Sequence, residues 1–224
     1  MTISKLKLKY SSLFFIPFIL MLGVFLCLGL PPFSKSSIHS GDFLSQYFPL
    51  YIGLHKMLWN GDFSGLFWSF EKSLGGAMPS VWGFNSLSPF TFLYVLFPIS
   101  SFHVISYIIP LIRFGVMGVV FGYFIEKKYQ AVSKRYWLAV GLCTSYALSG
   151  FIISQHYNPN FLDNLVYVPF IFLGIEDIFH GKKSIKLPVF LALSLITNFY
   201  TGYMMCLLII LYTCLLYTSD AADE

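Results

Sequence analysis

The sequence predicts an all-α integral membrane protein: a multi-pass helical bundle of about five transmembrane helices and a large first extracytoplasmic loop with interfacial helices. Hydrophobic residues make up 57% of the chain and charged residues 11%, whereas an ordinary soluble domain has about 25% charged residues. Several apolar runs of roughly 17–25 residues follow one another, and each is long enough to cross about 30 Å of hydrocarbon. A soluble domain of 224 residues would need more polar side chains on its surface.

The charges and cysteines argue against two other kinds of function. The net charge of +4 comes from lysine-rich loops, and no dense basic face with base-stacking groups indicates a nucleic-acid partner. Cys27, Cys143 and Cys206 lie inside apolar runs without the spacing of metal or disulfide motifs. They are therefore interpreted as small buried hydrophobic residues.

The first span is expected at residues 11–30. Lys5, Lys7 and Lys9 precede it, and Pro31 and Pro32 end it. A cleaved signal peptide would have a shorter apolar core and a cleavage site of small residues. The lysines place the N-terminus of this uncleaved span in the cytoplasm.

Residues 31–102 are expected to form the large outer loop. Apolar residues from Pro49 to Trp59 recur at helical spacing beside aromatic ones, which predicts a helix lying in the membrane interface. Glycine-containing turns follow at 60–62 and 75–76. The apolar run from Ser88 to Ile99 has only about 12 residues, which is too short to cross easily, so it is expected to be interfacial or re-entrant.

Further spans are expected at 103–125, 136–154, 164–179 and 187–213, the last long enough to be tilted. Basic residues cluster in the loops 127–135 and 182–186, on the same side as the N-terminal lysines. The positive-inside rule places this side in the cytoplasm. The loops 31–102 and 155–163 then share the extracytoplasmic side, where Asp42 and Asp163 could meet.

The final segment, 214–224, is interpreted separately. Its composition changes abruptly, and it reads like the translated end of a sequencing-library adapter, although a genuine short acidic tail is the alternative. Such a scar is excluded from fold reasoning. On this interpretation the natural protein continues beyond Thr213, and residues 1–213 are the N-terminal part of a longer membrane domain.

A series of short motifs resembles the bacterial YfhO family of multi-pass membrane proteins. In chain order they are Gly41–Tyr47, Leu74–Gly76, Leu87–Phe90, Ser145–Gly150, Asn160–Asp163 and Thr197–Met204. That family is similar in architecture to the GT-C glycosyltransferases, which take sugars from polyprenyl-phosphate donors at the outer face of the membrane. Some of its members are implicated in glycosylating lipoteichoic acid or related surface polymers. Family members are longer than this chain, which agrees with the interpretation of residues 1–213 as a fragment.

The resemblance implies a catalytic role for Asp42. GT-C enzymes carry an acidic residue shortly after the first span, and some carry another in the next outer loop, which Asp163 matches. A carboxylate can remove the proton of a hydroxyl acceptor, and the departing phosphate needs cations, a metal or hydrogen-bond donors. No cofactor is indicated; a divalent cation is possible, but the paired acids of an Asp-x-Asp motif are absent.

Other polar residues are candidates for substrate binding, each with a structural alternative. Gln46 and Tyr47 either bind substrate or anchor the loop. Arg113 lies inside a span, where a charge is costly and is paired or functional; it binds phosphate or pairs with a residue of the missing C-terminal part. Asn198 and Tyr200 line a cavity or join helices. The remaining candidates, Asp42 and Asp163, could instead cap helices.

The leading hypothesis is a membrane glycosyltransferase that uses a polyprenyl-phosphate sugar donor and a surface polymer or lipid acceptor at the outer face of the bilayer. A transporter or flippase is the first alternative, and it predicts several charges within spans and broken helices at mid-membrane. A non-enzymatic protein of envelope assembly is the second, and it predicts that Asp42 can be replaced without loss.

Overall fold

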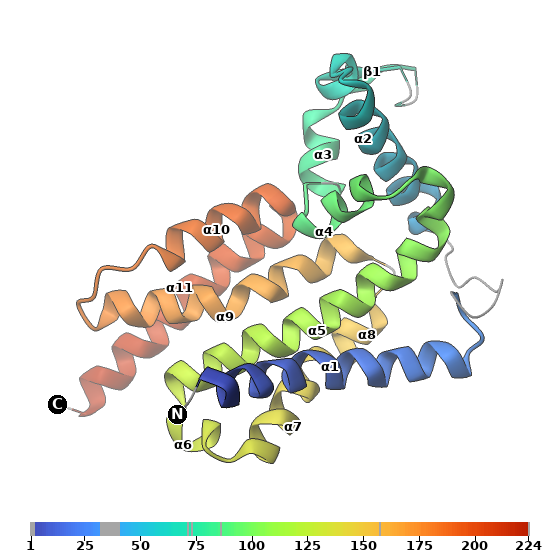
Figure 1. Ribbon diagram of the computed structural model, residues 1–224. Coiled ribbons are helices and arrows are strands. Elements are labelled where there is room, and N and C mark those ends of the chain that lie inside the picture. The colour runs from blue at the N-terminus through green and yellow to red at the C-terminus, as the bar shows by residue number, and fades with distance from the viewer. Residues whose placement is uncertain are drawn as a thin grey trace.

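Long helices form a bundle, and shorter ones form a cap at one end of it (Figure 1). The computed structural model describes residues 3–31, 41–70, 72, 74–85, 87–156 and 158–223. The bundle consists of α1 (Ile3–Cys27), α5 (Phe102–Lys128), α6 (Gln130–Ser133), α7 (Tyr136–Ala147), α8 (Gly150–Ser154), α9 (Pro159–Phe179), α10 (Lys186–Thr197) and α11 (Phe199–Asp223). The expected all-α multi-pass class is confirmed.

In the described part of the chain, four helical segments are long and apolar enough to cross a membrane. They are Tyr10–Cys27, Ile99–Lys128, Tyr136–Ser154 and Phe199–Thr218, and the first three agree with expected spans within a few residues. A break at Leu148 and Ser149 divides the third into α7 and α8. Helix α9, expected as the span 164–179, has 21 residues, but polar residues in its first turns lower its mean hydropathy.

The single tilted span expected at 187–213 is wrong, because the chain reverses direction inside it. Asn198 has an extended backbone (φ −157°, ψ 106°) and separates α10 from α11, which pack against each other as a hairpin. The side-chain oxygen of Asn198 accepts hydrogen bonds from the backbone N–H and the hydroxyl of Thr201, at 2.8 and 3.0 Å. The apolar periodicity continues across this position, so the capping interaction decides where the helix breaks.

Helix α5 is the centre of the bundle and packs against α1, α7 and α9. Two glycines four residues apart, Gly118 and Gly122, let α1 approach closely. A Cβ atom at Gly118 would lie 2.3 Å from the backbone oxygen of Leu13, and one at Gly122 would lie 2.3 Å from the Leu13 side chain. Small residues at this spacing allow two membrane helices to come into backbone contact.

The cap segment (residues 41–101) precedes α5. It contains a π-helical turn (Phe43–Tyr47), α2 (Phe48–Asn60), β1 (Trp68–Ser69), β2 (Gly76–Ala77), α3 (Pro79–Asn85), α4 (Pro89–Phe92) and 3₁₀ turns at Ser64–Leu66, Leu93–Leu96 and Ile99–Ser101. β1 and β2 are antiparallel, with Trp68 opposite Ala77 and Ser69 opposite Gly76. The helix expected at 49–59 is α2, and Ser88–Ile99 forms short turns that stay at this end of the bundle (Figure 1). Residues 32–40 of the expected outer loop lie outside the described residues.

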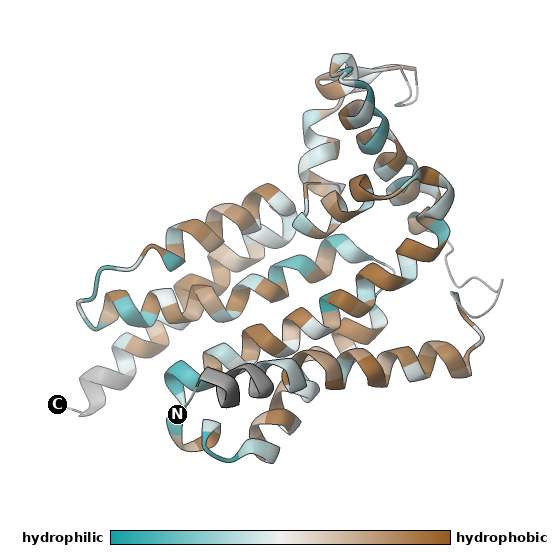
Figure 2. Cartoon of the chain, viewed as in Figure 1, coloured by the Kyte–Doolittle hydropathy of each residue, from teal (hydrophilic) through white to brown (hydrophobic). Residues whose placement is uncertain are grey.

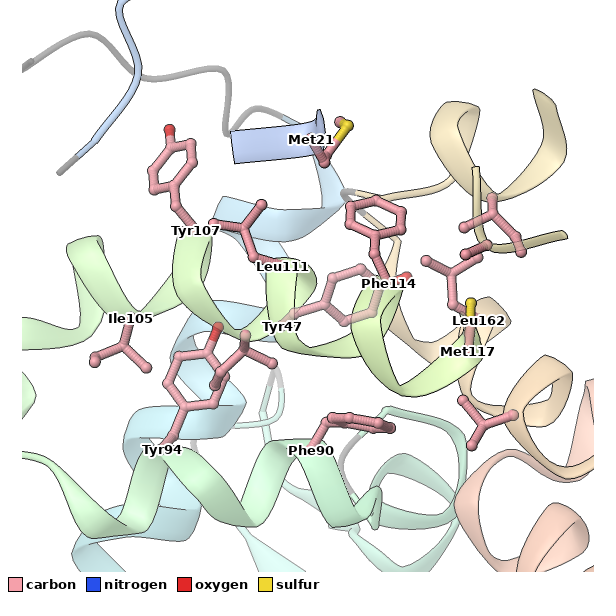
Figure 3. Close-up of a cluster of buried hydrophobic side chains, with 14 of the residues drawn as sticks. Met21, Tyr47, Phe90, Tyr94, Ile105, Tyr107, Leu111, Phe114, Met117 and Leu162 are labelled. Carbon is pink, nitrogen blue, oxygen red and sulfur yellow. The ribbon is translucent and has the colours of Figure 1, made fainter. Parts of the chain in front are cut away.

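The cap is attached to the bundle by buried aromatic side chains. Figure 3 shows Tyr47, Phe90 and Tyr94 from the cap, Met21 from α1 and Leu162 from α9 gathered around α5. Within the cap, ring nitrogens bind backbone carbonyls, from Trp59 to Val95 at 2.8 Å and from Trp82 to Leu66 at 3.0 Å. These contacts place the polar residues of the cap over the end of α5.

The opposite end of the bundle carries the lysine-rich connections, and we call it the lysine-rich end. The Tyr10 hydroxyl donates a hydrogen bond to Glu126 at 2.6 Å, so the start of α1 lies beside the end of α5. Figure 2 shows hydrophilic residues in the α5–α7 and α9–α10 connections at this end, and apolar residues along the helices between. The basic segments that the sequence predicts on one side therefore do lie together.

Replacing Gly118 by alanine is expected to destabilise the bundle by about 1–3 kcal/mol, because overpacking at a close helix contact forces the helices apart. The matched control is Gly141→Ala in α7, where a Cβ would meet nothing within 4 Å. Thermal unfolding of the full-length protein in detergent measures both variants. Equal unfolding temperatures for the two would contradict the close approach of α1 and α5.

Candidate functional site

The first two turns of α9 carry three polar residues on one side of the helix. Asn160, Asp163 and Asn164 follow the spacing i, i+3, i+4, which places their side chains on one helical face. All three are buried. The α9 helix begins at Pro159, so Asp163 lies in its second turn and does not cap it.

Asp163 forms an ion pair with Arg113 of α5. Arg113 Nε lies 2.9 Å from Asp163 Oδ1, and the two side chains are 2% and 1% exposed. The guanidinium also lies over the Phe90 ring, 4.7 Å from its centroid. Within the described part of the chain, Arg113 Nη1 and both carboxylate oxygens have no well-aligned hydrogen-bond partner. A buried pair of this kind is costly to break, because either charge left alone is desolvated and uncompensated.

A small cavity lies beside Arg113, between α5 and the cap. It has a volume of about 10 Å³ and is lined by Arg113, Tyr51, Tyr94 and Ser106 among others, which is roughly the space of one water molecule. Burial raises the pKa of Tyr51 well above its ordinary value and that of Tyr94 to about 12, so both phenols stay neutral. A sugar or phosphate group does not fit here, and Arg113 supports the cap in this structure.

Asn198 belongs to a second buried polar cluster, beneath α3. Its side-chain nitrogen donates to the backbone oxygen of Phe84 at 2.9 Å, while its oxygen caps α11 through Thr201. Asn164 in turn donates to the Thr201 hydroxyl. Asn198 is 0% exposed, so it joins the α10–α11 hairpin to the cap and to α9. The sequence left two roles for Asn198, lining a cavity or joining helices, and this geometry favours the second.

Asp42 lies at the entrance to the cap segment, with an exposed side chain. It occupies the N-cap position of the π-helical turn but makes no capping hydrogen bond. π-Helical turns are rare and are frequent at functional sites. Burial raises the pKa of the Tyr47 phenol, a hydrogen bond with Asn160 opposes this shift, and the charge of Asp42 adds to it. Asp42 is thus close to Tyr47, which reaches α9.

Gln46 lines an open groove on the cap. The groove has a volume of about 730 Å³, and its other walls include Ser45, Lys56 and Trp82. Gln46 follows Asp42 by four residues, just under one π-helical turn, so both side chains lie on one side of this segment. Tyr200, at the start of α11, is 48% exposed, and its ring lies 6.5 Å from that of Phe161.

The structure brings some predicted site residues together and keeps others apart. Arg113 pairs with Asp163. The hydrogen bonds of Asp42 and Asp163 do not support a capping role for either residue. Asp42 and Asp163 lie at the same end but do not meet, because Asp163 is buried beneath the cap. Among the described residues, no three His, Cys, Asp or Glu side chains gather as metal ligands.

Sequence reasoning missed the polar face of α9 and its partners. The signal was present: Asn160, Asp163 and Asn164 have helical spacing, but the helix was expected to start only at Asn164. Thr201 and the backbone of Phe84 could not be found in this way, because only the fold brings them to Asn198.

Replacing one partner of the buried ion pair is expected to destabilise the protein more, per substitution, than replacing both partners together. Asp163→Asn or Arg113→Gln alone should destabilise the full-length protein by about 3–5 kcal/mol, because each leaves one buried charge without a partner, whereas the double variant should lose less than the two singles combined. The control is Asp177→Asn, which removes a partly exposed ion pair worth about 0–1 kcal/mol. Thermal unfolding in detergent measures all four, and additive losses would contradict direct pairing.

Comparison with known proteins gives one match. A family model described as the bacterial membrane protein YfhO matches residues 12–224. No curated protein and no solved structure matches the chain. The match includes residues 214–224, and the adapter interpretation of this segment stays a prediction. A match over nearly the whole chain, together with the apolar helices described above, establishes that this protein is a membrane protein of the bacterial YfhO family.

Proposed function

We propose that this protein is a membrane glycosyltransferase that moves a sugar from a polyprenyl-phosphate donor to a surface polymer or lipid acceptor on the extracytoplasmic face. The observation that carries the proposal is Asp42: an exposed carboxylate, free of any capping hydrogen bond, at a π-helical turn whose Ser45 and Gln46 line the open groove of the cap. Membership of the YfhO family supports a role in the cell envelope.

The proposed reaction needs one base. Asp42 accepts the proton of the acceptor hydroxyl while the hydroxyl oxygen bonds to the anomeric carbon of the donor sugar. The bond from that carbon to the phosphate oxygen breaks, and polyprenyl phosphate leaves with the electron pair. A single carboxylate acting as base leads to inversion at the anomeric carbon.

The other residues take two kinds of role in this proposal. Gln46 and Tyr200 are exposed at the cap end and are proposed to bind substrate. Arg113, Asp163, Tyr47 and Asn198 are buried and are proposed to hold the cap in position from below.

We also propose an orientation in the cytoplasmic membrane of the bacterial cell. The start of α1 and the α5–α7 and α9–α10 connections lie at one end of the bundle, and the cap lies at the other. Basic residues are enriched in cytoplasmic loops. The N-terminus and the lysine-rich end are therefore assigned to the cytoplasm, and the cap with Asp42 to the outside.

A transporter or flippase is the second candidate, and one observation favours it. Transporters contain helices that break within the membrane, and here the chain interrupts an apolar run at Asn198, although it does so by reversing direction at the cap end. The side-chain nitrogen and oxygen of Asn198 are both hydrogen-bonded within the protein, however. An unwound segment that binds cargo would present such groups to a cavity, so transport is the weaker proposal.

Asp42→Asn and Asp42→Ala are expected to lower sugar transfer at least about 100-fold, because both remove the general base. Each variant of the full-length protein is expressed in a strain that lacks it, its membrane level is checked, and surface-polymer sugars are analysed by mass spectrometry. Glu126→Gln, at the lysine-rich end, is the control and should restore the wild-type pattern. Full restoration by both Asp42 variants would refute a catalytic role for this residue.

The orientation is tested by cysteine labelling in a variant that lacks the four native cysteines. Ser64→Cys in the cap should react with a membrane-impermeant maleimide on intact cells. Lys183→Cys, in the α9–α10 connection, should react only after the membrane is opened, because the bilayer separates the two ends. The reverse pattern would place the cap in the cytoplasm and exclude an extracytoplasmic reaction.

A further inference from the structure

A third pocket lies at the lysine-rich end, remote from the cap. It has a volume of about 550 Å³ and is formed by the ends of α5 and α9, the α9–α10 connection and the start of α10. We call it the basic pocket, since Lys127, Lys128, Lys182 and Lys186 line it. The glycosyltransferase proposal assigns it no role.

Two of these lysines are held by the acidic residues of the pocket. Lys128 pairs with Glu176 and also donates to the Tyr212 hydroxyl at 2.8 Å. Lys186 pairs with Asp177 at 2.5 Å. Both carboxylates of the pocket are therefore neutralised, and they keep the ends of α5, α9, α10 and α11 together.

The other two lysines provide an excess of positive charge. Lys127 and Lys182 are exposed, and neither forms an ion pair with any residue that the structure describes. The Lys127 ammonium lies 5.5 Å from the centroid of the Tyr123 ring, which leaves its hydrogen-bond donors available. The pocket thus presents the two ammonium groups of Lys127 and Lys182, next to ion pairs whose charges already balance each other.

The pocket also has an apolar side. Leu173 and Phe179 line it, and Ile178 and Ile185 are exposed beside it, at 48% and 78%. It lies where the α5 span ends at Lys128, the level at which lipid headgroups meet the acyl region. Basic pockets at this level between membrane helices bind the headgroups of anionic lipids.

We propose that the basic pocket binds the phosphate group of an anionic ligand through Lys127 and Lys182. Two sources have this chemistry: the headgroup of an anionic phospholipid, whose acyl chains would follow the apolar side, and a soluble phosphate compound. This site is independent of Asp42 and of the proposed transfer reaction.

The test is native mass spectrometry of the full-length protein in detergent, with phosphatidylglycerol, phosphatidylcholine or inorganic phosphate added. Wild type should retain phosphatidylglycerol in preference to phosphatidylcholine. Lys127→Gln/Lys182→Gln should lose roughly 10- to 30-fold of this preference, as expected for two lysines near an anionic group. Lys127→Arg/Lys182→Arg should keep it, because the charge remains.

The matched control is Lys134→Gln/Arg135→Gln, which removes two exposed charges at the same end but outside the pocket. If the control keeps the preference for phosphatidylglycerol and Lys127→Gln/Lys182→Gln loses it, the ligand is a lipid. Lysine-dependent binding of inorganic phosphate without any lipid preference supports a soluble ligand instead. If neither ligand depends on Lys127 and Lys182, or if the control loses as much, the proposal is overturned.

Discussion

The buried ion pair between Arg113 and Asp163 is the interaction on which the cap end depends. A charged side chain inside an apolar bundle is costly unless it is paired, and this pair fixes α9 against α5 at 2.9 Å. The Phe90 ring of the cap packs on the same guanidinium. One interaction therefore links the central helix, α9 and the segment that carries Asp42.

The two ends of the bundle use charge in opposite ways. At the cap end the charged pair is sealed beneath aromatic side chains, and the exposed polar residues, Asp42 and Gln46, lie above it. At the lysine-rich end the ion pairs of Lys128 and Lys186 are partly exposed, so solvent screens them and they contribute less stability. At the cap end the buried pair supports the segment that carries Asp42. At the lysine-rich end Lys127 and Lys182 remain available for the proposed phosphate ligand.

Close helix packing explains how so apolar a chain acquires a defined arrangement. The glycines of α5 bring α1 into backbone contact, and Gly174 and Gly202 do the same for α10 against α9 and α11. Apolar side chains alone give little preference for one neighbour in a membrane, because lipid is equally apolar. Glycine contacts and a few buried polar groups therefore select which helices meet.

The sequence by itself determined the all-α class, three of the apolar spans, the helix α2 and the clustering of lysines at one end, because composition, run length and periodicity are local properties. It also identified Asp42, Arg113 and Asp163 as residues that need an explanation. Only the tertiary structure decided that Arg113 and Asp163 are partners, that Asp42 stays apart from them, and that Asn198 reverses the chain. The ion pair joins side chains 50 residues apart in the sequence. The Asn198 cap on Thr201 is local, but the Asn198 amide is also held by the backbone of Phe84 in the cap. No local pattern contains these long-range contacts.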